Sequence, residues 1–283
     1  MGSVRREAGA IPRKQRTMNI ELEQEVINVT KGQQIIRIST KHAIYVRDIV
    51  TQFDYYYNSV EPVWGVVDFS KPAFHKVIGF DQPIKFPSFS EPLESTRQYL
   101  DFAQLKPGDV VLDLGAYSGL TSILFSQAVG ESGRVVAVEA DITNWGCLLE
   151  NTKLQENITR IFGAIWEHNH GVEFSAETNM GSSAAAIVGR RGKMQGVPSF
   201  TLSHLMTIAG LDRVDFIKVD VEGAEKVIFH DAEFFKTYHP RMIIETHHTD
   251  EHVIATLVNL GYHVKRVTQN GVRFPLLECV WNQ

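Results

Sequence analysis

The sequence predicts an α/β fold: a doubly wound, mostly parallel sheet of seven strands with an antiparallel C-terminal hairpin, preceded by a small mixed region. The first observation is that short apolar runs alternate with segments of helical spacing from about residue 91 onward. Such alternation favours right-handed βαβ crossovers and therefore parallel strands. The second is that the last two apolar runs are too close for a crossover, with Gly271 in the turn between them. These two strands must pair antiparallel.

The main domain is predicted to span residues 91–283, and each of its elements follows from a local pattern. Short runs of Val, Ile and Leu indicate buried strands at residues 109–114, 134–139, 158–166, 214–221, 242–246, 263–268 and 274–281. Apolar residues at helical spacing indicate helices at residues 92–105, 121–129, 143–154, 202–209, 224–236 and 251–260. In open α/β sheets, ligands bind beyond the carboxyl ends of the strands, so we expect the functional site there.

Two segments precede the main domain. Residues 1–17 carry five basic side chains and one acidic side chain, a net charge of +4, and have no apolar face. We expect this segment to be a disordered basic tail. Residues 18–90 are predicted to form a small α+β region, with short strands at 33–39, 43–46, 63–69 and 74–78.

Composition excludes several classes of protein. Apolar residues make up 43% and charged residues 22% of the 283 residues, as in an average soluble protein. No apolar run is long enough for a membrane span or a secretory signal, and two cysteines are too few for a disulfide framework. We therefore expect a cytoplasmic protein without a membrane partner. The chain after residue 17 has a net charge of −9, which argues against a nucleic-acid partner.

The loop after the first strand indicates the cofactor. Residues 113–119 read DLGAYSG, so Tyr117 and Leu120 stand where a dinucleotide-binding G-x-G-x-x-G motif has glycines. Asp113 would repel a pyrophosphate, and Glu139, at the end of the second strand, can accept hydrogen bonds from both hydroxyls of a ribose. A ligand with a ribose, a positive charge and no phosphate is S-adenosylmethionine. The alternatives are a nicotinamide-dependent oxidoreductase, which Tyr117 and Leu120 disfavour, and a tight turn with solvated acids.

Three further motifs give a specific resemblance. Residues 110–116 (VVLDLGA), 136–140 (VAVEA) and 215–225 (DFIKVDVEGAE), with 181–183 (GSS) and 244–247 (IETH), occur in order and at suitable spacing. Over residues 91–248 the chain resembles the FkbM family of S-adenosylmethionine-dependent methyltransferases. The resemblance implies a class I methyltransferase fold, which is Rossmann-like, and usually O-methylation of a hydroxyl on a sugar, glycan or natural product. The chain departs from the family pattern at Ser118, which is a mild change, and at Ser203-His204 in place of the family's Asp-Asp, which leaves the substrate contacts open.

Candidate site residues follow from strand ends and from this resemblance. Asp220, at the end of the fourth strand, is a candidate general base or metal ligand, although an Asp there could instead cap the next helix. His247 is a competing base with a suitable ordinary pKa, and Lys218 lies on the same strand face as Asp220. We expect the cofactor to contact Asp113, Gly115, Ala116, Tyr117, Ser118, Gly119, Glu139, Ala140, Ala164, Asp220 and Glu94.

Metal use and the acceptor remain open at this point. A divalent metal held by Asp220, Glu222 and Glu245 is one hypothesis, and the spacing of His248 and His252 suits a metal pair or, more simply, a solvated helix start. The expected acceptor is a small molecule or a glycan, and residues 18–90 are expected to cap the acceptor side. A catalytically inactive binding module on the same fold is a further alternative. The sequence predicts no oligomeric state.

Overall fold

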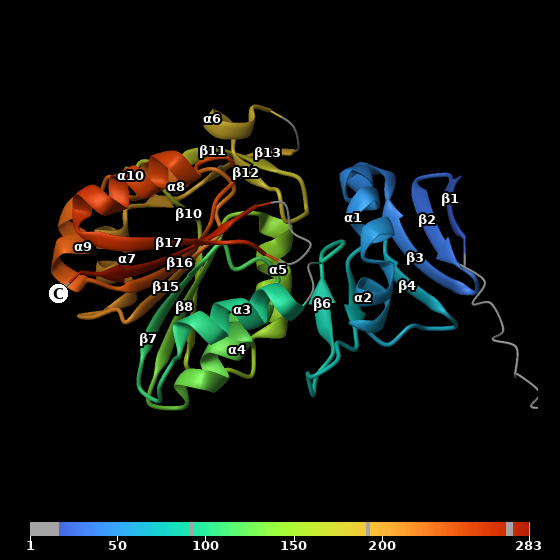
Figure 1. Ribbon diagram of the computed structural model, residues 1–283, viewed down its shortest axis with the longest axis horizontal. Coiled ribbons are helices and arrows are strands. Elements are labelled where there is room, and N and C mark those ends of the chain that lie inside the picture. The colour runs from blue at the N-terminus through green and yellow to red at the C-terminus, as the bar shows by residue number, and fades with distance from the viewer. Residues whose placement is uncertain (1–16, 91–92, 191–192, 270–273, 283) are drawn as a thin grey trace, which may run out of the picture.

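The computed structural model describes residues 17–90, 93–190, 193–269 and 274–282 of the chain. The basic tail predicted over residues 1–17 lies, apart from Thr17, outside the described residues. Figure 1 shows two parts, a smaller one built from the N-terminal elements and a larger one built around a twisted sheet. No helix in the described ranges is both long and apolar enough to cross a lipid bilayer.

The larger part contains the predicted seven-stranded sheet. In chain order its strands are β7 (Val110–Leu114), β8 (Arg134–Glu139), β9 (Ile158–Phe162), β15 (Phe216–Val219), β16 (Arg241–Glu245), β17 (Tyr262–Val267) and β18 (Leu276–Trp281). Across the sheet the order is β17-β18-β16-β15-β7-β8-β9. Strand β18 is antiparallel to both of its neighbours, and the other described pairings are parallel. The predicted doubly wound sheet with an antiparallel hairpin is confirmed.

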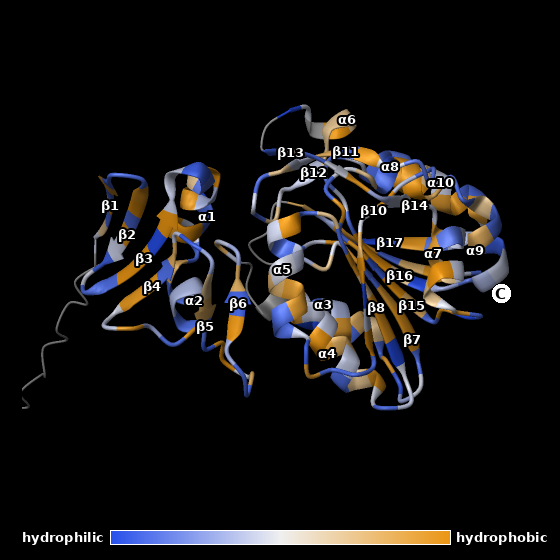
Figure 2. Ribbon diagram, turned by 180° about the vertical axis from the view of Figure 1, so that it is seen from behind, coloured by the Kyte–Doolittle hydropathy of each residue, from blue (hydrophilic) through white to orange (hydrophobic). Residues whose placement is uncertain are grey.

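Helices cover both faces of this sheet. They are α3 (Leu93–Ala103), α4 (Leu120–Val129), α5 (Ile142–Asn151), α7 (Leu202–Ala209), α8 (Glu225–Ile228), α9 (Ala232–Tyr238) and α10 (Asp250–Leu260). The short helix α6 (Ala185–Val188) packs instead against residues 172–184, outside the main sheet. Successive strand side chains point to opposite faces, so Val111 packs with Tyr99, Phe125 and Leu148 on one face, whereas Leu112 shares a core with α7, α9 and α10 on the other. The apolar strands lie between the two helix layers in Figure 2.

Two predicted elements of the larger part are interrupted. The strand predicted at residues 158–166 breaks at Gly163, whose φ is +150°, and continues as β10 (Ala164–Ile165), which pairs with β14 (Ser199–Phe200) outside the main sheet. The helix predicted at 224–236 is two helices, α8 and α9, with Asp231 between them. A three-stranded sheet of β11 (Val172–Ala176), β12 (Ser183–Ala184) and β13 (Lys193–Val197) was not predicted.

The smaller part has its own sheet, in the order β1-β2-β3-β4, with a separate hairpin of β5 and β6. Its elements are β1 (Met18–Glu23), β2 (Val26–Lys31), β3 (Gln34–Ser39), the 3₁₀ helix η1 (Thr40–Tyr45), α1 (Val46–Thr51), α2 (Phe53–Asn58), β4 (Val66–Phe69), β5 (Ala73–His75) and β6 (Ile84–Phe86). The strand predicted at 43–46 is wrong. The Ser39 side chain accepts a hydrogen bond from the Lys41 amide and caps a helical turn there.

The two parts share a core and a polar contact. Leu120 and Ile123 of α4 pack into the apolar cluster of residues 27–89. The Asn151 carboxamide accepts from the Lys85 amide (2.7 Å) and donates to the carbonyls of Lys85 (2.8 Å) and Ser118 (2.7 Å). Ser118 belongs to the loop after β7. Asn151 therefore connects Lys85 of the smaller part to the edge of the sheet where ligands are expected.

Candidate active site

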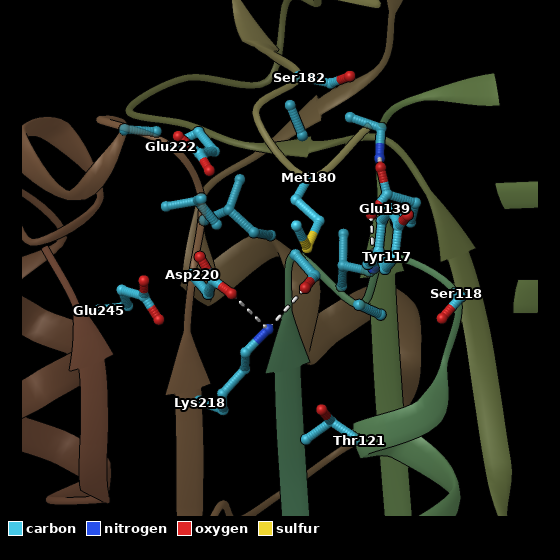
Figure 3. Close-up of a pocket in the computed structure, with 18 of the residues that line it drawn as sticks. Tyr117, Ser118, Thr121, Glu139, Met180, Ser182, Lys218, Asp220, Glu222 and Glu245 are labelled. Atoms are coloured by element: carbon cyan, nitrogen blue, oxygen red, sulfur yellow. Dashed lines mark hydrogen bonds and ion pairs between the residues drawn. The ribbon is translucent and has the colours of Figure 1, made fainter. Parts of the chain in front are cut away.

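A cavity opens at the carboxyl ends of β7, β8 and β15, and it encloses about 1110 Å³ including the solvent at its open mouth. One wall is the loop after β7, and the opposite wall comes from residues that follow β15 and from Glu245 at the end of β16. Met180 and Ser182, from the loop before β12, close the upper side in Figure 3. A concave, partly apolar pocket at this edge of the sheet is typical of a small-molecule site.

The loop after β7 depends on glycine. Gly115 has φ +75°, and a Cβ there would lie 1.8 Å from the Asp220 carbonyl oxygen, so only a residue without a side chain lets β7 and β15 approach. Tyr117 also has a positive φ, +49°. Its amide donates to Glu139 Oε2 at 2.8 Å, and its hydroxyl donates to the Phe89 carbonyl at 3.1 Å. The loop is therefore held by β8 on one side and by the smaller part on the other.

Glu139 ends β8 with its carboxylate at the cavity wall. Oε1 accepts from the amides of Ala140 (2.9 Å) and Asp141 (2.7 Å), and Oε2 accepts from Tyr117. Burial raises the pKa of Glu139 to about 7, although the three backbone donors favour the ionised form. The side chain is thus oriented before any ligand binds, with lone pairs still available to further donors.

Asp113, Lys218 and Asp220 form an ionic network across β7 and β15, in which Asp113 and Lys218 are buried and Asp220 is partly exposed. The Lys218 ammonium lies 3.4 Å from both Asp113 Oδ1 and Asp220 Oδ2, and it donates to the Gly115 carbonyl at 2.6 Å. Burial acts to lower the pKa of Lys218, but the two carboxylates outweigh it and hold the pKa above its ordinary value. Figure 3 shows Lys218 pointing toward Asp220. Lys218 therefore fixes one oxygen of Asp220.

His247 brings a second cluster to the other side of Asp220. Its Nδ1 is 2.9 Å from Glu225 Oε1, and its Nε2 is 3.4 Å from Glu222 Oε1 and 3.9 Å from Asp220 Oδ1. Burial acts to lower the pKa of His247, but Glu225, Glu222 and Asp220 outweigh it and raise the pKa to about 10. Burial raises the pKa of Glu222 to about 8, although His247 opposes the shift.

The structure brings most of the predicted site residues to the cavity, with some exceptions. Those that line it are Gly115, Ala116, Tyr117, Ser118, Glu139, Ala140, Ala164, Lys218 and Asp220. Gly119 is the N-cap residue of α4 and does not line the cavity. Asp113 does not line it either, and its buried carboxylate accepts from the Ser122 hydroxyl at 2.5 Å. Glu94 lies in the first turn of α3, and its side chain is outside the described part of the chain.

The structure replaces one of the three residues predicted to hold a metal: His247 takes the place of Glu245. Asp220 and Glu222 converge with His247, and their ligand atoms all lie within 4.8 Å of one another. Glu245 lines the cavity separately and accepts from the Tyr99 hydroxyl at 2.9 Å. His248 is exposed, and the exposed His252 has Nε2 3.2 Å from the Lys226 carbonyl. These two histidines take no part in the converging group.

Sequence reasoning missed two acidic residues that organise the site. Asp141 caps α5, and its Oδ2 accepts from the Thr178 amide (3.0 Å) and the Ser182 hydroxyl (2.8 Å), which fixes the loop carrying Met180. Glu225 is fully buried behind His247. Glu225 lies inside the DFIKVDVEGAE motif, so the motif contained a signal for it. Nothing in the sequence links Asp141 to Ser182, because that contact depends on tertiary structure.

Both protein families whose models match this chain are methyltransferase families. Residues 113–264 match the methyltransferase FkbM domain family, and residues 70–146 match the protein-L-isoaspartate(D-aspartate) O-methyltransferase family. A search of curated proteins gave no match.

Solved structures with similar folds are distant. The methyltransferase FkbM of Methylobacillus flagellatus KT is 15% identical, with 66% of this chain and 50% of that chain covered and a TM-score of 0.47. The precorrin-6y C5,15-methyltransferase of Geobacter metallireducens GS-15 is 18% identical, with 68% and 91% covered and a TM-score of 0.45. Aeropyrum pernix fibrillarin, solved with natively bound S-adenosyl-L-methionine, is 16% identical, with 93% and 99% covered and a TM-score of 0.44.

Proposed function

This chain belongs to the FkbM family of methyltransferases, and from that premise we propose that it methylates a hydroxyl of an uncharged small molecule or glycan. Its cofactor is S-adenosyl-L-methionine, as the family establishes. The family does not favour the alternative of a nicotinamide-dependent oxidoreductase. The observation that carries the proposal is the position of Asp220, which lines the cofactor cavity and also borders the acidic cluster around His247.

The residues of the cavity fit this cofactor. Glu139 offers a preoriented carboxylate to the two ribose hydroxyls, and the loop after β7 forms the adjoining wall. Ala140, Ala164 and Phe174 provide small and apolar surface for the adenine ring. Away from Glu139, the cavity is lined by the carboxylates of Asp220 and Glu245. These suit a ligand that carries positive charge. When bound, the cofactor supplies an electrophilic methyl group on a sulfonium.

Asp220 is the residue we assign to the acceptor proton. A neutral hydroxyl is a poor nucleophile, and removal of its proton in the transition state contributes about 10²–10⁴-fold to a rate. Lys218 holds Oδ2 of Asp220, while Oδ1 faces His247 at 3.9 Å. Lys218 therefore acts as a positioning residue. His247 is the competing candidate, but its pKa of about 10 leaves it protonated near neutral pH.

The charge of the site favours an uncharged acceptor. The carboxylates of Asp220 and Glu245 both line the cavity, and carboxylates accept hydrogen bonds from hydroxyls. They repel phosphates and carboxylates, which disfavours nucleic-acid backbones and acidic side chains as acceptors. A polyhydroxylated neutral molecule is the class of acceptor that this lining suits best.

We assign residues 18–90 to the acceptor side of the main domain, residues 91–283. His42 Nε2 is 3.3 Å from the Glu177 carbonyl, in the loop that carries Met180 and Ser182 to the cavity. Met180 and Tyr117 both pack against the apolar cluster of the smaller part. Residues 18–90 thus touch two walls of the cavity and support the segments that an acceptor would meet.

The test is a substrate screen with isotopically labelled cofactor. The protein would be incubated with libraries of neutral glycans and hydroxylated small molecules, with RNA and protein as further arms, and labelled products would be identified by mass spectrometry. We expect label on a hydroxyl oxygen of a neutral compound. With that acceptor, Asp220→Asn should lower turnover about 10²–10⁴-fold and leave cofactor affinity nearly unchanged.

Two controls make the outcome decisive. Asp212→Asn removes an exposed carboxylate before β15 and should not affect turnover. His247→Gln tests the competing base, and a large loss there with normal turnover in Asp220→Asn would move the base to His247. Label confined to RNA, to a protein carboxyl group or to no compound at all would refute the proposed acceptor class.

A further inference from the structure

The residues around His247 contain more negative than positive charge. Four carboxylates, those of Asp113, Asp220, Glu222 and Glu225, surround the cations Lys218 and His247 within 4 Å. Lys218 is engaged on the far side of Asp220 by Asp113 and by the Gly115 carbonyl. On the side of Asp220 away from Lys218, the carboxylates of Asp220, Glu222 and Glu225 therefore share His247 as their cationic partner, and a partly buried group of like charges favours a bound cation.

The His247 side chain is held in a fixed orientation within this cluster. Its side chain is 9% exposed, and Nδ1 is held by Glu225, which is fully buried. Nε2 forms no hydrogen bond within the described ranges, although Glu222 Oε1 is 3.4 Å away and Asp220 Oδ1 is 3.9 Å away. Nε2 thus lies near both carboxylates without a hydrogen bond to either. A carboxylate behind the imidazole is the arrangement that orients metal-binding histidines.

The spacing of the three ligand atoms suits a single ion. Metal–ligand distances of about 2.1 Å place neighbouring ligands about 3 Å apart and opposite ligands about 4.2 Å apart. The observed separations of 3.4 and 3.9 Å, with all three atoms within 4.8 Å, need only small side-chain movements to reach these values. Ser183 Oγ donates to the Glu222 carbonyl at 2.6 Å and fixes the backbone of that ligand.

We propose that Asp220, Glu222 and His247 form a binding site for a divalent first-row cation at the acceptor end of the cavity. Two carboxylate oxygens and one imidazole nitrogen are a mixed donor set, which Mn²⁺ accepts, and binding of the ion would release the Nε2 proton of His247 to solvent. Asp220 and Glu222 line the cavity, so the ion would keep open positions on that side. The role of the ion rests on the proposed function: when bound, it would lower the pKa of an acceptor hydroxyl beside Asp220, so that the proton of this hydroxyl would pass to Asp220 more readily.

The test measures Mn²⁺ binding directly, with the full chain and no acceptor. Binding removes the electron paramagnetic resonance signal of free Mn²⁺, and calorimetry gives the stoichiometry. We expect one ion per chain, with affinity lowered about tenfold or more in Asp220→Asn, Glu222→Gln and His247→Gln. The matched control is His252→Gln, an exposed histidine near the same strand end, which should bind Mn²⁺ like the natural chain.

The possible outcomes test the cation site and the proposed acceptor class independently. S-Adenosylhomocysteine titrations and thermal melts of each variant show whether the cofactor pocket and the fold are intact. Absence of Mn²⁺ binding, or equal binding by the natural chain and all three variants, overturns the cation site. If Mn²⁺ binding is lost in the variants but the screen yields no hydroxyl acceptor, the cation site stands and the proposed acceptor class fails.

Discussion

Glu139 is held by three backbone amides and yet has a raised pKa of about 7. A ribose diol needs the ionised carboxylate as its acceptor, so cofactor affinity should rise as the pH rises through 7. If only the ionised form binds, affinity increases about tenfold between pH 6 and pH 8, because apparent affinity scales with the competent fraction. Calorimetry with S-adenosylhomocysteine over this range checks the expectation.

The matched variant for this prediction is Glu139→Gln, which keeps the size of the side chain and cannot ionise. Its affinity should be lower than that of the natural chain at pH 8 and should vary little with pH. If the variant keeps the full pH dependence, another group is responsible for it.

Single residues differ in how far their roles could be predicted. Glu139 and Asp220 were identified because both end predicted strands, and strand ends in a parallel sheet meet at one edge. Asp113 was expected to face the cofactor. It is instead opposite Lys218 in the register of β7 and β15 and pairs with it beneath the cavity. A sequence does not state strand order or register, so the Asp113–Lys218 pair could not be predicted.

At the scale of elements, the strand-to-helix turn after β7 gives the sharpest prediction. Gly115→Ala would place a Cβ 1.8 Å from the Asp220 carbonyl oxygen at φ +75°. Backbone strain of this kind alone costs about 1–3 kcal/mol, and separating β7 from β15 adds to it. We expect the free energy of unfolding in urea to fall by more than about 2 kcal/mol.

A second glycine supplies the control for that experiment. Gly146 lies within α5, is exposed, and an added Cβ would have no atom within 4 Å. Gly146→Ala should therefore raise the free energy of unfolding by up to about 1 kcal/mol, since alanine is the better helix former. Equal effects of the two substitutions would contradict the close approach of β7 and β15.

The elements of the larger part were predictable because each has a strong local pattern. The runs that became β7, β8 and β16 are continuous and apolar, as buried parallel strands are. The smaller part was harder. Residues 43–46 contain β-favouring Ile and Tyr, but the cap by Ser39 and the packing of Ile49 and Phe53 favour helical turns there. Tertiary contacts outweigh local propensity in such short segments.

At the scale of the whole molecule, Asn151 joins the smaller part to the site. Asn151→Asp keeps the size of the side chain but sets a carboxylate against the carbonyls of Lys85 and Ser118. Unsatisfied buried groups cost about 1–3 kcal/mol, so we expect faster amide exchange in β6, measured by mass spectrometry. Asn259→Asp, at an exposed position in α10, should leave that exchange unchanged. Unchanged exchange in Asn151→Asp would show that apolar packing alone holds the two parts together.

The strand order of the main sheet also dictates an order of assembly. Strand β17 precedes β18 in the chain, but in the sheet β18 lies between β17 and β16. Among the described strands, β17 pairs with β18 and with no other, so it has no place in the sheet until β18 arrives beside β16. During synthesis, β17 and its buried Tyr262 side chain cannot join the sheet until the residues of β18 have been made. The nascent chain therefore passes through a stage in which β16 is an open edge, and this stage is where a chaperone or a misplaced strand could compete for it.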